Sequence, residues 1–255
     1  MSYVGFNYFI AQWPPAVNLD QLRLNDLTAL IHQAGWSVPA RQEVDDVAYL
    51  QGLIDAICEL STRDPLTGVA NRRAFLSVLN QEIDRVARSG EPALLVAVDI
   101  DHFKQVNDRY GHLVGDQVIR AVAAALKECV RPMDTVARLG GEEFAVVFPN
   151  CPPSFGEVVA ERLRAAVLRL ELEAAGQRLP VTVSCGGAYA PPWVRTTADA
   201  WMERADREMY RAKASGRNCV CLEHTPISEV SAEEKGLLFA WSSTDPLMMQ
   251  PAASS

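Results

Sequence analysis

The chain has 255 residues, of which 49% are hydrophobic and 22% are charged, as in ordinary folded globular proteins. This composition excludes collagen-like, mucin-like and wholly disordered chains, and the length allows one domain with extensions or two small domains. No stretch approaches the roughly 18–20 consecutive apolar residues of a membrane helix, and the N-terminus lacks the features of a secretory signal. We therefore expect a cytoplasmic protein without a membrane segment.

The net charge of −8 is distributed unevenly along the chain. Residues 1–60 carry 2 basic and 7 acidic side chains, residues 224–255 carry 1 and 4, and the segment between them carries 21 of each sign. Because a nucleic-acid-binding protein usually has a basic surplus, we expect no nucleic-acid partner. Any phosphate group that the protein binds must be held by a few local cations.

Two helices are expected before residue 62. The first covers 19–34 and lies in an N-terminal extension, 1–42, whose aromatic start suits packing or contact with an unknown partner. The second covers 43–61 and has the a/d spacing of a two-heptad coiled coil at Val47, Leu50, Ile54 and Ile57. Two interpretations remain open: a stalk that pairs with a second copy, or an amphipathic helix that packs on its own domain.

From residue 62 to residue 223, helices alternate with strands. The expected helices cover 71–89, 113–130, 154–172 and 197–214, and the expected strands cover 93–101, 135–139, 143–148, 180–189 and 218–223. Gly140 and Gly141 separate two of these strands and predict a hairpin. We expect an α/β (α+β) domain in which a mixed central sheet is flanked by helices, followed by a disordered tail at 224–255.

Two acidic pairs stand at strand ends. Asp99 and Asp101 close an apolar strand, and Glu142 and Glu143 follow the two glycines of the hairpin. Carboxylates at the carboxyl end of a central strand lie where α/β folds place ligands, and oxygen ligands suit Mg²⁺. Each pair alone is weak evidence, because a strand-end Asp often caps a helix and a hairpin Glu is usually solvated.

Four segments together carry a recognisable signature. They are DPLTGVANRRAF at 64–75, VDIDHFKQVNDRYGHLVGDQ at 98–117, RLGGEEF at 138–144 and YRAKASGRN at 210–218. In this order they resemble the GGDEF-domain diguanylate cyclases, over a domain that we place at 62–223. The resemblance implies a fold similar to the palm of nucleotidyl cyclases and polymerases. It also implies a homodimer that joins two GTP molecules into cyclic di-GMP and releases two pyrophosphates.

The motifs imply which residues hold metal. Asp99, the Ile100 carbonyl and Glu142 correspond to the ligands of two Mg²⁺ (or Mn²⁺) ions per active site, with Glu143 in support. Glu142, Glu143 and Lys104 are the implied catalytic residues. Adjacent side chains of an extended strand point to opposite faces, so we expect Glu142 to be the indispensable carboxylate. Which carboxylate accepts the proton of the attacking hydroxyl stays open.

The resemblance also assigns the GTP-binding residues. Asn107 and Asp116 correspond to the guanine-reading positions, with His112 beside them, and Lys213 and Arg217 correspond to the phosphate-binding positions. The chemistry agrees, because an ionised carboxylate can accept both the N1–H and the N2–H₂ of guanine, whereas adenine presents an acceptor at N1. The alternative for the two cations is that they complement the end of a helix.

A second motif, R-x-x-D at Arg131 and Asp134, lies nine residues before Gly140 and matches the family's product-inhibition site. Arginine suits bidentate contact with a guanine edge or a phosphate, and cyclic di-GMP is then both product and inhibitor. Arg138 either adds charge to this site or supports the signature turn.

Two functions remain to be compared. The first is an active diguanylate cyclase, and the second is a catalytically silent GGDEF module that acts as a receptor for cyclic di-GMP or GTP. The signature carboxylates and the base-reading residues are all present, which favours turnover: Asp99, Asn107, Asp116, Glu142 and Glu143.

Overall fold

The computed structural model describes residues 22–191 and 196–224. The first residues of the helix expected at 19–34, and all but the first residue of the tail expected to be disordered at 224–255, lie outside the described residues. Among the described helices, none combines the length and the apolar character that crossing a membrane requires.

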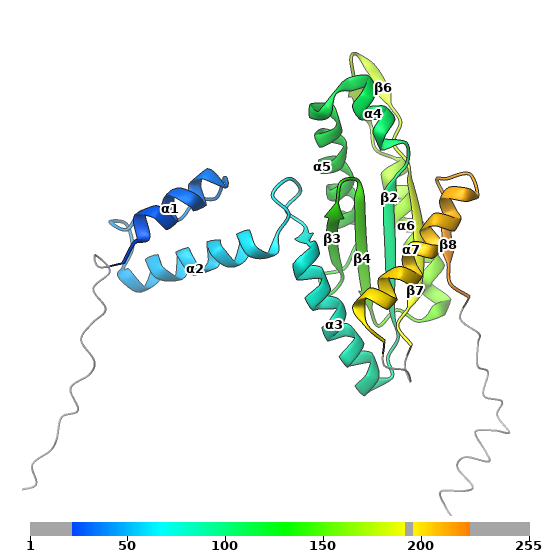
Figure 1. Ribbon diagram of the computed structural model, residues 1–255, viewed down its shortest axis with the longest axis horizontal. Helices are drawn as coiled ribbons and strands as arrows, with labels where there is room; N and C mark the ends of the chain where they lie inside the picture. Colours follow the sequence, from blue (N-terminus) through cyan, green and yellow to red (C-terminus); the bar gives the residue numbers. More distant parts are fainter. Residues whose placement is uncertain (1–21, 192–195, 225–255) are drawn as a thin grey trace, which may run out of the picture. The chain divides into compact units, whose positions relative to one another are not determined.

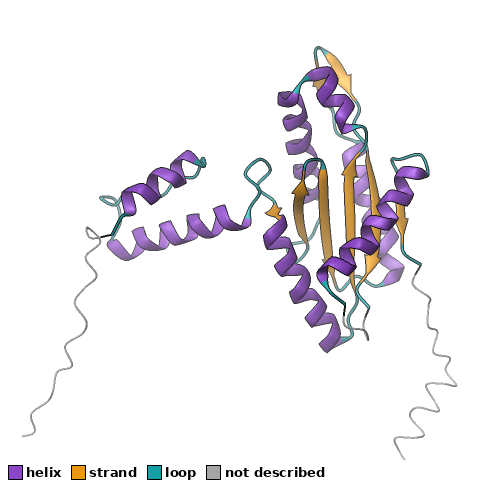
Figure 2. Cartoon of the chain, viewed as in Figure 1, coloured by secondary structure: helices purple, strands orange, loops and turns teal. Residues whose placement is uncertain are grey.

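A six-stranded mixed sheet forms the centre of the domain, as the alternating pattern predicted (Figures 1 and 2). Its strands, in spatial order, are β1 (Ala70–Asn71), β3 (Thr135–Gly140), β4 (Glu143–Pro149), β2 (Ala93–Ile100), β7 (Val183–Tyr189) and β8 (Val220–Leu222). The four middle strands are antiparallel, whereas β1 and β8 pair in parallel at the edges. Every residue of β2 is buried, as expected for a strand that is covered on both faces.

Helices cover both faces of this sheet (Figure 1). They are α3 (Arg72–Ser89) and α7 (Ala198–Ala214) on one face, and α5 (His112–Glu128) and α6 (Pro153–Leu168) on the other. Side chains of β2 alternate between the two cores: Leu95 and Ala97 pack with α3 and α7, and Val96 and Val98 pack with α5 and α6. A short helix, α4 (Phe103–Tyr110), follows the end of β2.

Close packing of α7 on β7 requires a glycine. A Cβ atom at Gly186 would overlap the backbone nitrogen of Met209 and the backbone oxygen of Ala205. The missing side chain lets the backbones of helix and strand approach each other. Trp201 of the same helix donates its indole N–H to the Ala188 carbonyl at 2.9 Å in the buried interface. These contacts fix α7, which carries Lys213, against the centre of the sheet.

The segment between α6 and β7 differs from the prediction. The expected helix over 154–172 ends at Leu168, and the expected strand over 180–189 begins at Val183. Between them lies a hairpin of β5 (Leu172–Ala174) and β6 (Gln177–Leu179), whose turn residues Ala175 and Gly176 have positive φ angles of 52° and 73°. Apolar residues at 170 and 172 continue the spacing of the expected helix. In the structure they follow the end of α6 and pack on the core outside any helix.

The N-terminal helices form a small cluster of their own. They are α1 (Leu24–Gln33) and α2 (Asp46–Thr62). The helix expected from residue 43 begins at Asp46, because the Asp45 side chain caps it by accepting from the backbone N–H groups of Val47 and Ala48. Ile31 of α1 packs with Tyr49, Leu53 and Ala56 of α2.

The predicted a/d seam lies on a different face of α2 from this cluster. Val47, Ile54 and Ile57 are 77%, 52% and 41% exposed, whereas Leu50 is half-buried beside the α1 cluster. Packing of α2 on its own chain therefore uses Tyr49, Leu53 and Ala56, and leaves three of the four seam residues exposed.

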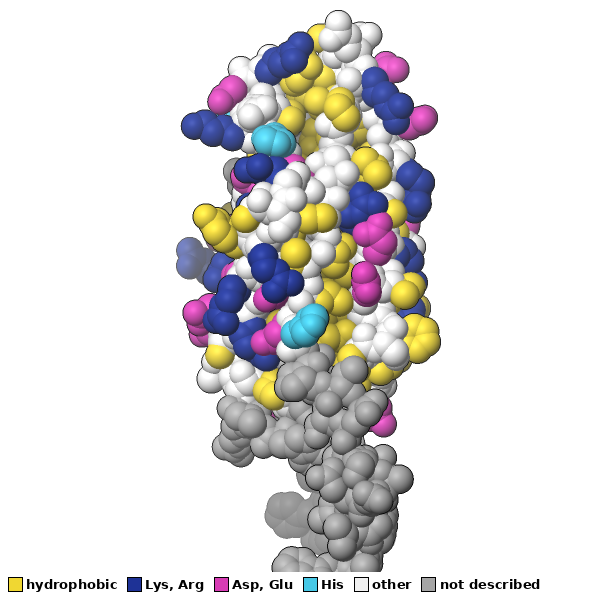
Figure 3. Space-filling model, turned by 90° about the vertical axis from the view of Figure 1, so that its right-hand side faces the viewer, with side chains coloured by type: hydrophobic (Ala, Val, Ile, Leu, Met, Phe, Trp, Pro, Cys, Tyr) yellow, Lys and Arg dark blue, Asp and Glu magenta, His cyan; other side chains and the backbone are white. Residues whose placement is uncertain are grey.

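The surface of the molecule agrees with the charge count. On the face shown in Figure 3, basic and acidic side chains are interspersed, together with scattered apolar ones. This distribution fits a middle segment that carries equal numbers of both signs.

Candidate functional site

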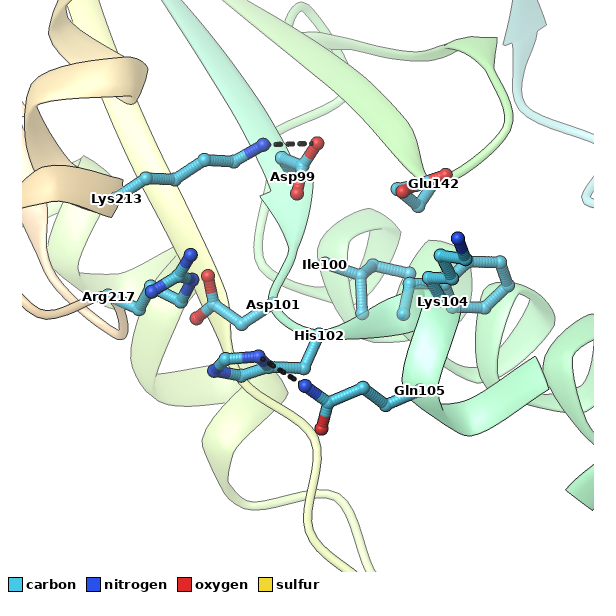
Figure 4. A pocket seen from close by; sticks show the side chains of 10 residues that line it. Asp99, Ile100, Asp101, His102, Lys104, Gln105, Glu142, Lys213 and Arg217 are labelled. Carbon is cyan, nitrogen blue, oxygen red and sulfur yellow. Dashed lines mark hydrogen bonds and ion pairs between the residues drawn. The ribbon is translucent and has the colours of Figure 1, made fainter. Parts of the chain in front are cut away.

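A cavity of about 280 Å³ lies at the carboxyl end of β2 (Figure 4). Six of the residues predicted from motifs line it: Asp99, Ile100, Lys104, Glu142, Lys213 and Arg217. They come from β2, from α4, from the turn between β3 and β4, and from α7 with the turn that follows it. The sheet thus brings together side chains that are more than one hundred residues apart in the sequence.

Asp99 is the most constrained carboxylate of this cavity. Its side chain is 8% exposed, and its Oδ2 lies 2.8 Å from the Lys213 ammonium. Burial raises the pKa of Asp99, the hydrogen bond and charge of Lys213 lower it, and the nearby Glu142 and Glu143 raise it again. The net result is a pKa of Asp99 above its ordinary value, with the positive charge of Lys213 opposing the rise.

Glu142 and Glu143 have different places. Glu142 lies in the turn and points into the cavity (Figure 4), and its carbonyl accepts from the Ile100 N–H at 3.3 Å. Glu143 is the first residue of β4, directly opposite Asp99 in the antiparallel ladder, and is not part of the cavity lining. Residues directly opposite each other in an antiparallel pair project to the same face of the sheet, so Glu143 lies on the side of Asp99, and its support as a metal ligand stays a prediction.

The residues around the cavity suit a hard cation. Within residues 22–191 and 196–224, no three His, Cys, Asp or Glu side chains are grouped as a metal cluster. Two carboxylates, Asp99 and Glu142, nevertheless converge with the Ile100 backbone on one cavity. This is an all-oxygen donor set, which Mg²⁺ and Mn²⁺ prefer, and Mg²⁺ commonly completes its shell with water and substrate phosphates.

The predicted guanine-reading residues lie beside this cavity rather than in its lining. Asn107 is on α4, and His112 and Asp116 are on α5, where His112 is exposed and Asp116 is half-buried. A Cβ at Gly115 would overlap the Asn107 side-chain oxygen, so this glycine allows Asn107 to pack against the turn that carries Asp116. The role of Gly115 was missed, although a glycine inside a helix is unfavourable and signals such a contact.

Arg131 and Asp134 form a tight pair. Asp134 accepts from the Arg131 backbone N–H at 2.8 Å and from its Nη2 at 2.9 Å, and its side chain is fully buried. The Arg131 guanidinium also donates to the Pro149 carbonyl at 3.1 Å. In this conformation both oxygens of the Asp134 carboxylate accept hydrogen bonds from Arg131.

A second cavity, of about 320 Å³, lies next to this pair. Its lining includes Arg131, Phe155 and Arg162. Arg162 was missed, because it lies on α6, thirty-one residues after Arg131 and outside any motif.

Arg138 has its contacts away from the cavity of Arg131. Its Nη1 lies 3.2 Å from the Asp64 carboxylate, and its Nε donates to the Gly141 carbonyl at 3.0 Å. Arg138 does not line the cavity of Arg131. It therefore ties the signature turn to the loop that begins the domain, which is the second of the two roles considered for it.

The decisive comparison is with a protein-family model. Residues 61–219, more than half of the chain, match the model described as diguanylate cyclase, GGDEF domain. The chain belongs to this GGDEF family. Its fold and the order of its motifs agree with that membership.

Named relatives share the domain at about 40% identity. The chain is 41% identical over 155 residues to diguanylate cyclase DgcP of Pseudomonas aeruginosa, covering 61% of the chain and 23% of DgcP. It is 40% identical over 174 residues to the response regulator PleD of Caulobacter vibrioides, covering 68% of the chain and 38% of PleD. The chain thus spans less than half the length of these relatives.

Solved structures extend the similarity beyond the domain. The coiled coil and GGDEF domain of DgcB from Caulobacter crescentus, in complex with cyclic di-GMP, matches with a TM-score of 0.64 and 32% identity, covering 81% of this chain and 100% of that one. Diguanylate cyclase SiaD from Pseudomonas aeruginosa, in complex with its activator SiaC, matches with a TM-score of 0.63 and 34% identity, covering 80% and 74%.

Packing at Gly115 leads to a stability prediction. Gly115→Ala should lower the free energy of unfolding by about 1–3 kcal/mol, the usual cost of overpacking. In an Asn107→Ala background most of this loss should disappear, because the added methyl no longer meets the amide. Urea unfolding of the wild type, the two single variants and the double variant measures the coupling energy between the two positions. An equal loss of stability in both backgrounds would show that the two residues are not in contact.

Proposed function

We propose that the protein is a diguanylate cyclase, which condenses two GTP molecules into cyclic di-GMP and two pyrophosphates. The observation that carries this proposal is the cavity in which Asp99 and Glu142 lie together with Lys213 and Arg217. Acidic ligands for a metal and basic ligands for phosphates are both needed for phosphoryl transfer. Family membership and the named cyclases among the relatives support the same activity.

The reaction joins the 3′-oxygen of one GTP to the α-phosphorus of another and breaks the bond from that phosphorus to the pyrophosphate. Asp99, Glu142 and the Ile100 carbonyl would hold two Mg²⁺ (or Mn²⁺) ions. When bound, such ions lower the pKa of the hydroxyl and stabilise the leaving oxygens. Glu143, opposite Asp99 on β4, adds negative charge that favours cation binding.

The chain's own cations orient the triphosphate. Lys104 and Arg217 line the cavity, and Lys213 bridges from α7 to the carboxylate of Asp99. Their positive charges compensate the phosphate oxygens in a domain that is otherwise formally neutral. Guanine would be read beside this cavity by Asp116 and Asn107, with His112 at the exposed rim.

Two GTP molecules require two subunits in this proposal, because the cavity at the end of β2 would hold one GTP. We assign dimerisation to the exposed seam of α2, formed by Val47, Ile54 and Ile57, because apolar residues at a/d spacing stabilise a helical pair. The match to the structure of the coiled coil and GGDEF domain of DgcB supports this assignment. SiaD is bound to a protein activator, SiaC, in its structure. By analogy, we propose that the N-terminal extension of this chain binds an activating protein.

Product inhibition is assigned to the cavity of Arg131 and Arg162. Two guanidinium groups at one apolar cavity suit the phosphates and guanine edges of cyclic di-GMP. Asp134 is assigned a positioning role, because it holds Arg131 by its backbone and by its side chain.

Substituting the metal-binding carboxylates tests catalysis. Glu142→Gln and Asp99→Asn should each lower the rate of cyclic di-GMP formation at least about 100-fold, because each removes a charge that the metal and the transition state need. The measurement is product formation from GTP and Mg²⁺, with circular dichroism as the control for folding. Normal rates in either variant would exclude the proposed site. GTP binding without turnover in the wild type would instead favour a receptor.

Dimerisation through α2 is tested at Ile54. Ile54→Asp should move the concentration for half-maximal specific activity upward by about tenfold or more, because a charge enters an apolar seam. Ala48→Asp is the matched control, since it adds the same charge at an exposed position on another face of α2. Sedimentation gives the association constant of each protein. Equal association of both variants would show that the seam is not the interface.

Feedback is tested by titrating initial rates with cyclic di-GMP. Arg131→Ala should weaken the binding of cyclic di-GMP by about 1–3 kcal/mol, as for a lost bidentate contact, and so weaken inhibition. The rate without added cyclic di-GMP should not change. Arg178→Ala, on the exposed part of β6, is the control. Identical inhibition of Arg131→Ala and the wild type would place the product elsewhere.

A further inference from the structure

Asp101, the second carboxylate after β2, has its hydrogen-bonding capacity directed into the protein. It is 6% exposed and accepts three hydrogen bonds: from Thr182 Oγ1 at 2.7 Å, from Ser184 Oγ at 2.6 Å and from the backbone N–H of Asn218 at 3.0 Å. An ionised carboxylate can accept all three bonds, because it has acceptors only. The site assigned to catalysis above gives this residue no role.

The turn bound by Asp101 has an unfavourable backbone conformation. Gly216, Arg217 and Asn218 have φ angles of 113°, 65° and 46°. Glycine and asparagine adopt the left-handed region readily, whereas it is disfavoured for Arg217, so contacts around this residue help to hold the turn. Asp101 supplies one such contact, and Arg164 supplies another by donating to Asn218 Oδ1 at 2.6 Å.

The end of β2 therefore holds the α7 region at two points. Asp99 pairs with Lys213 on the helix at 2.8 Å, and Asp101 binds the backbone of Asn218 in the following turn. Arg217, immediately before Asn218, lines the same cavity as Asp101 (Figure 4). The strand that presents the metal-binding carboxylate thus also determines where this arginine lies.

We propose that Asp101 is a positioning residue that holds the turn at 216–218 so that Arg217 meets the phosphates of GTP. This inference rests on the proposed function, because that function assigns Arg217 to the phosphates. Asp101 lines the same cavity as Arg217, but its carboxylate oxygens accept hydrogen bonds from three protein groups, so we assign its action to the placement of Arg217. Its three protein donors leave it unsuited to metal binding, although it stands two residues from Asp99 in the same strand end.

The test measures triphosphate binding without turnover. The probe is 3′-deoxy-GTP with Mg²⁺, which lacks the attacking hydroxyl, and its Kd is measured by calorimetry. Asp101→Ala should raise this Kd about tenfold, as expected when a charged group's hydrogen bonds are lost. Asp101→Asn should stay within about threefold of the wild type, because an amide oxygen can still accept from Asn218.

A double-mutant cycle separates positioning from general damage. In an Arg217→Ala background, Asp101→Ala should change the Kd less than about twofold, because the group through which it acts is gone. Glu223→Ala is the matched control: its carboxylate accepts from Arg204 at 2.9 Å, just after β8, and its loss should leave the Kd unchanged. Where Asp101→Ala does not fold, as judged by circular dichroism, Asp101→Ser replaces it with the same expectation.

Two results would overturn the proposal: an unchanged Kd in the folded Asp101 variant, or an effect of equal size with and without Arg217. Failure of the proposed function gives a different result, since the wild type would bind 3′-deoxy-GTP but form no cyclic di-GMP from GTP. A wild type that binds no triphosphate would contradict both.

Discussion

The site depends on how one buried strand end accommodates ionised carboxylates. β2 is buried along its whole length, and the two aspartates at its end are each 6% exposed. Burial raises the pKa of Asp99, and the Lys213 ammonium opposes this rise. Asp101 accepts hydrogen bonds from the Thr182 and Ser184 hydroxyls and from the Asn218 backbone N–H. The end of β2 is therefore tied both to β7 and to the region of α7 and its following turn.

Glycines make this approach possible. Gly186 lets α7 lie directly on β7, and Gly115 lets Asn107 pack against α5. In both places a side chain would occupy space that backbone or a functional amide already fills. Close packing thus positions Lys213 at the cavity and holds Asn107, a proposed base-reading residue, against α5. The absence of a Cβ atom allows tight packing of helix on strand at Gly186, and it allows the placement of the Asn107 side chain at Gly115.

The boundary of the domain is tied to the signature turn by polar contacts. Asp64, at the start of the domain, binds Arg138, which in turn binds the Gly141 carbonyl of the turn that presents Glu142. Just before this loop, α2 ends at Thr62 and carries its exposed seam. A short covalent path therefore joins the proposed dimerisation helix to a loop that contacts the catalytic turn.

By itself, the sequence determined the family, the mixed sheet, most element positions and six residues of one cavity, because periodicity and motif order are local properties. Only the tertiary structure decided the places and contacts of Glu143, Arg138, Arg162, Asp101 and Gly115. The strand register places Glu143 opposite Asp99. Arg138 binds Asp64, which lies 74 residues away in the sequence. The bond from Asp101 to Asn218 spans 117 residues. Such pairings arise from the packing of distant elements, and no local pattern encodes them.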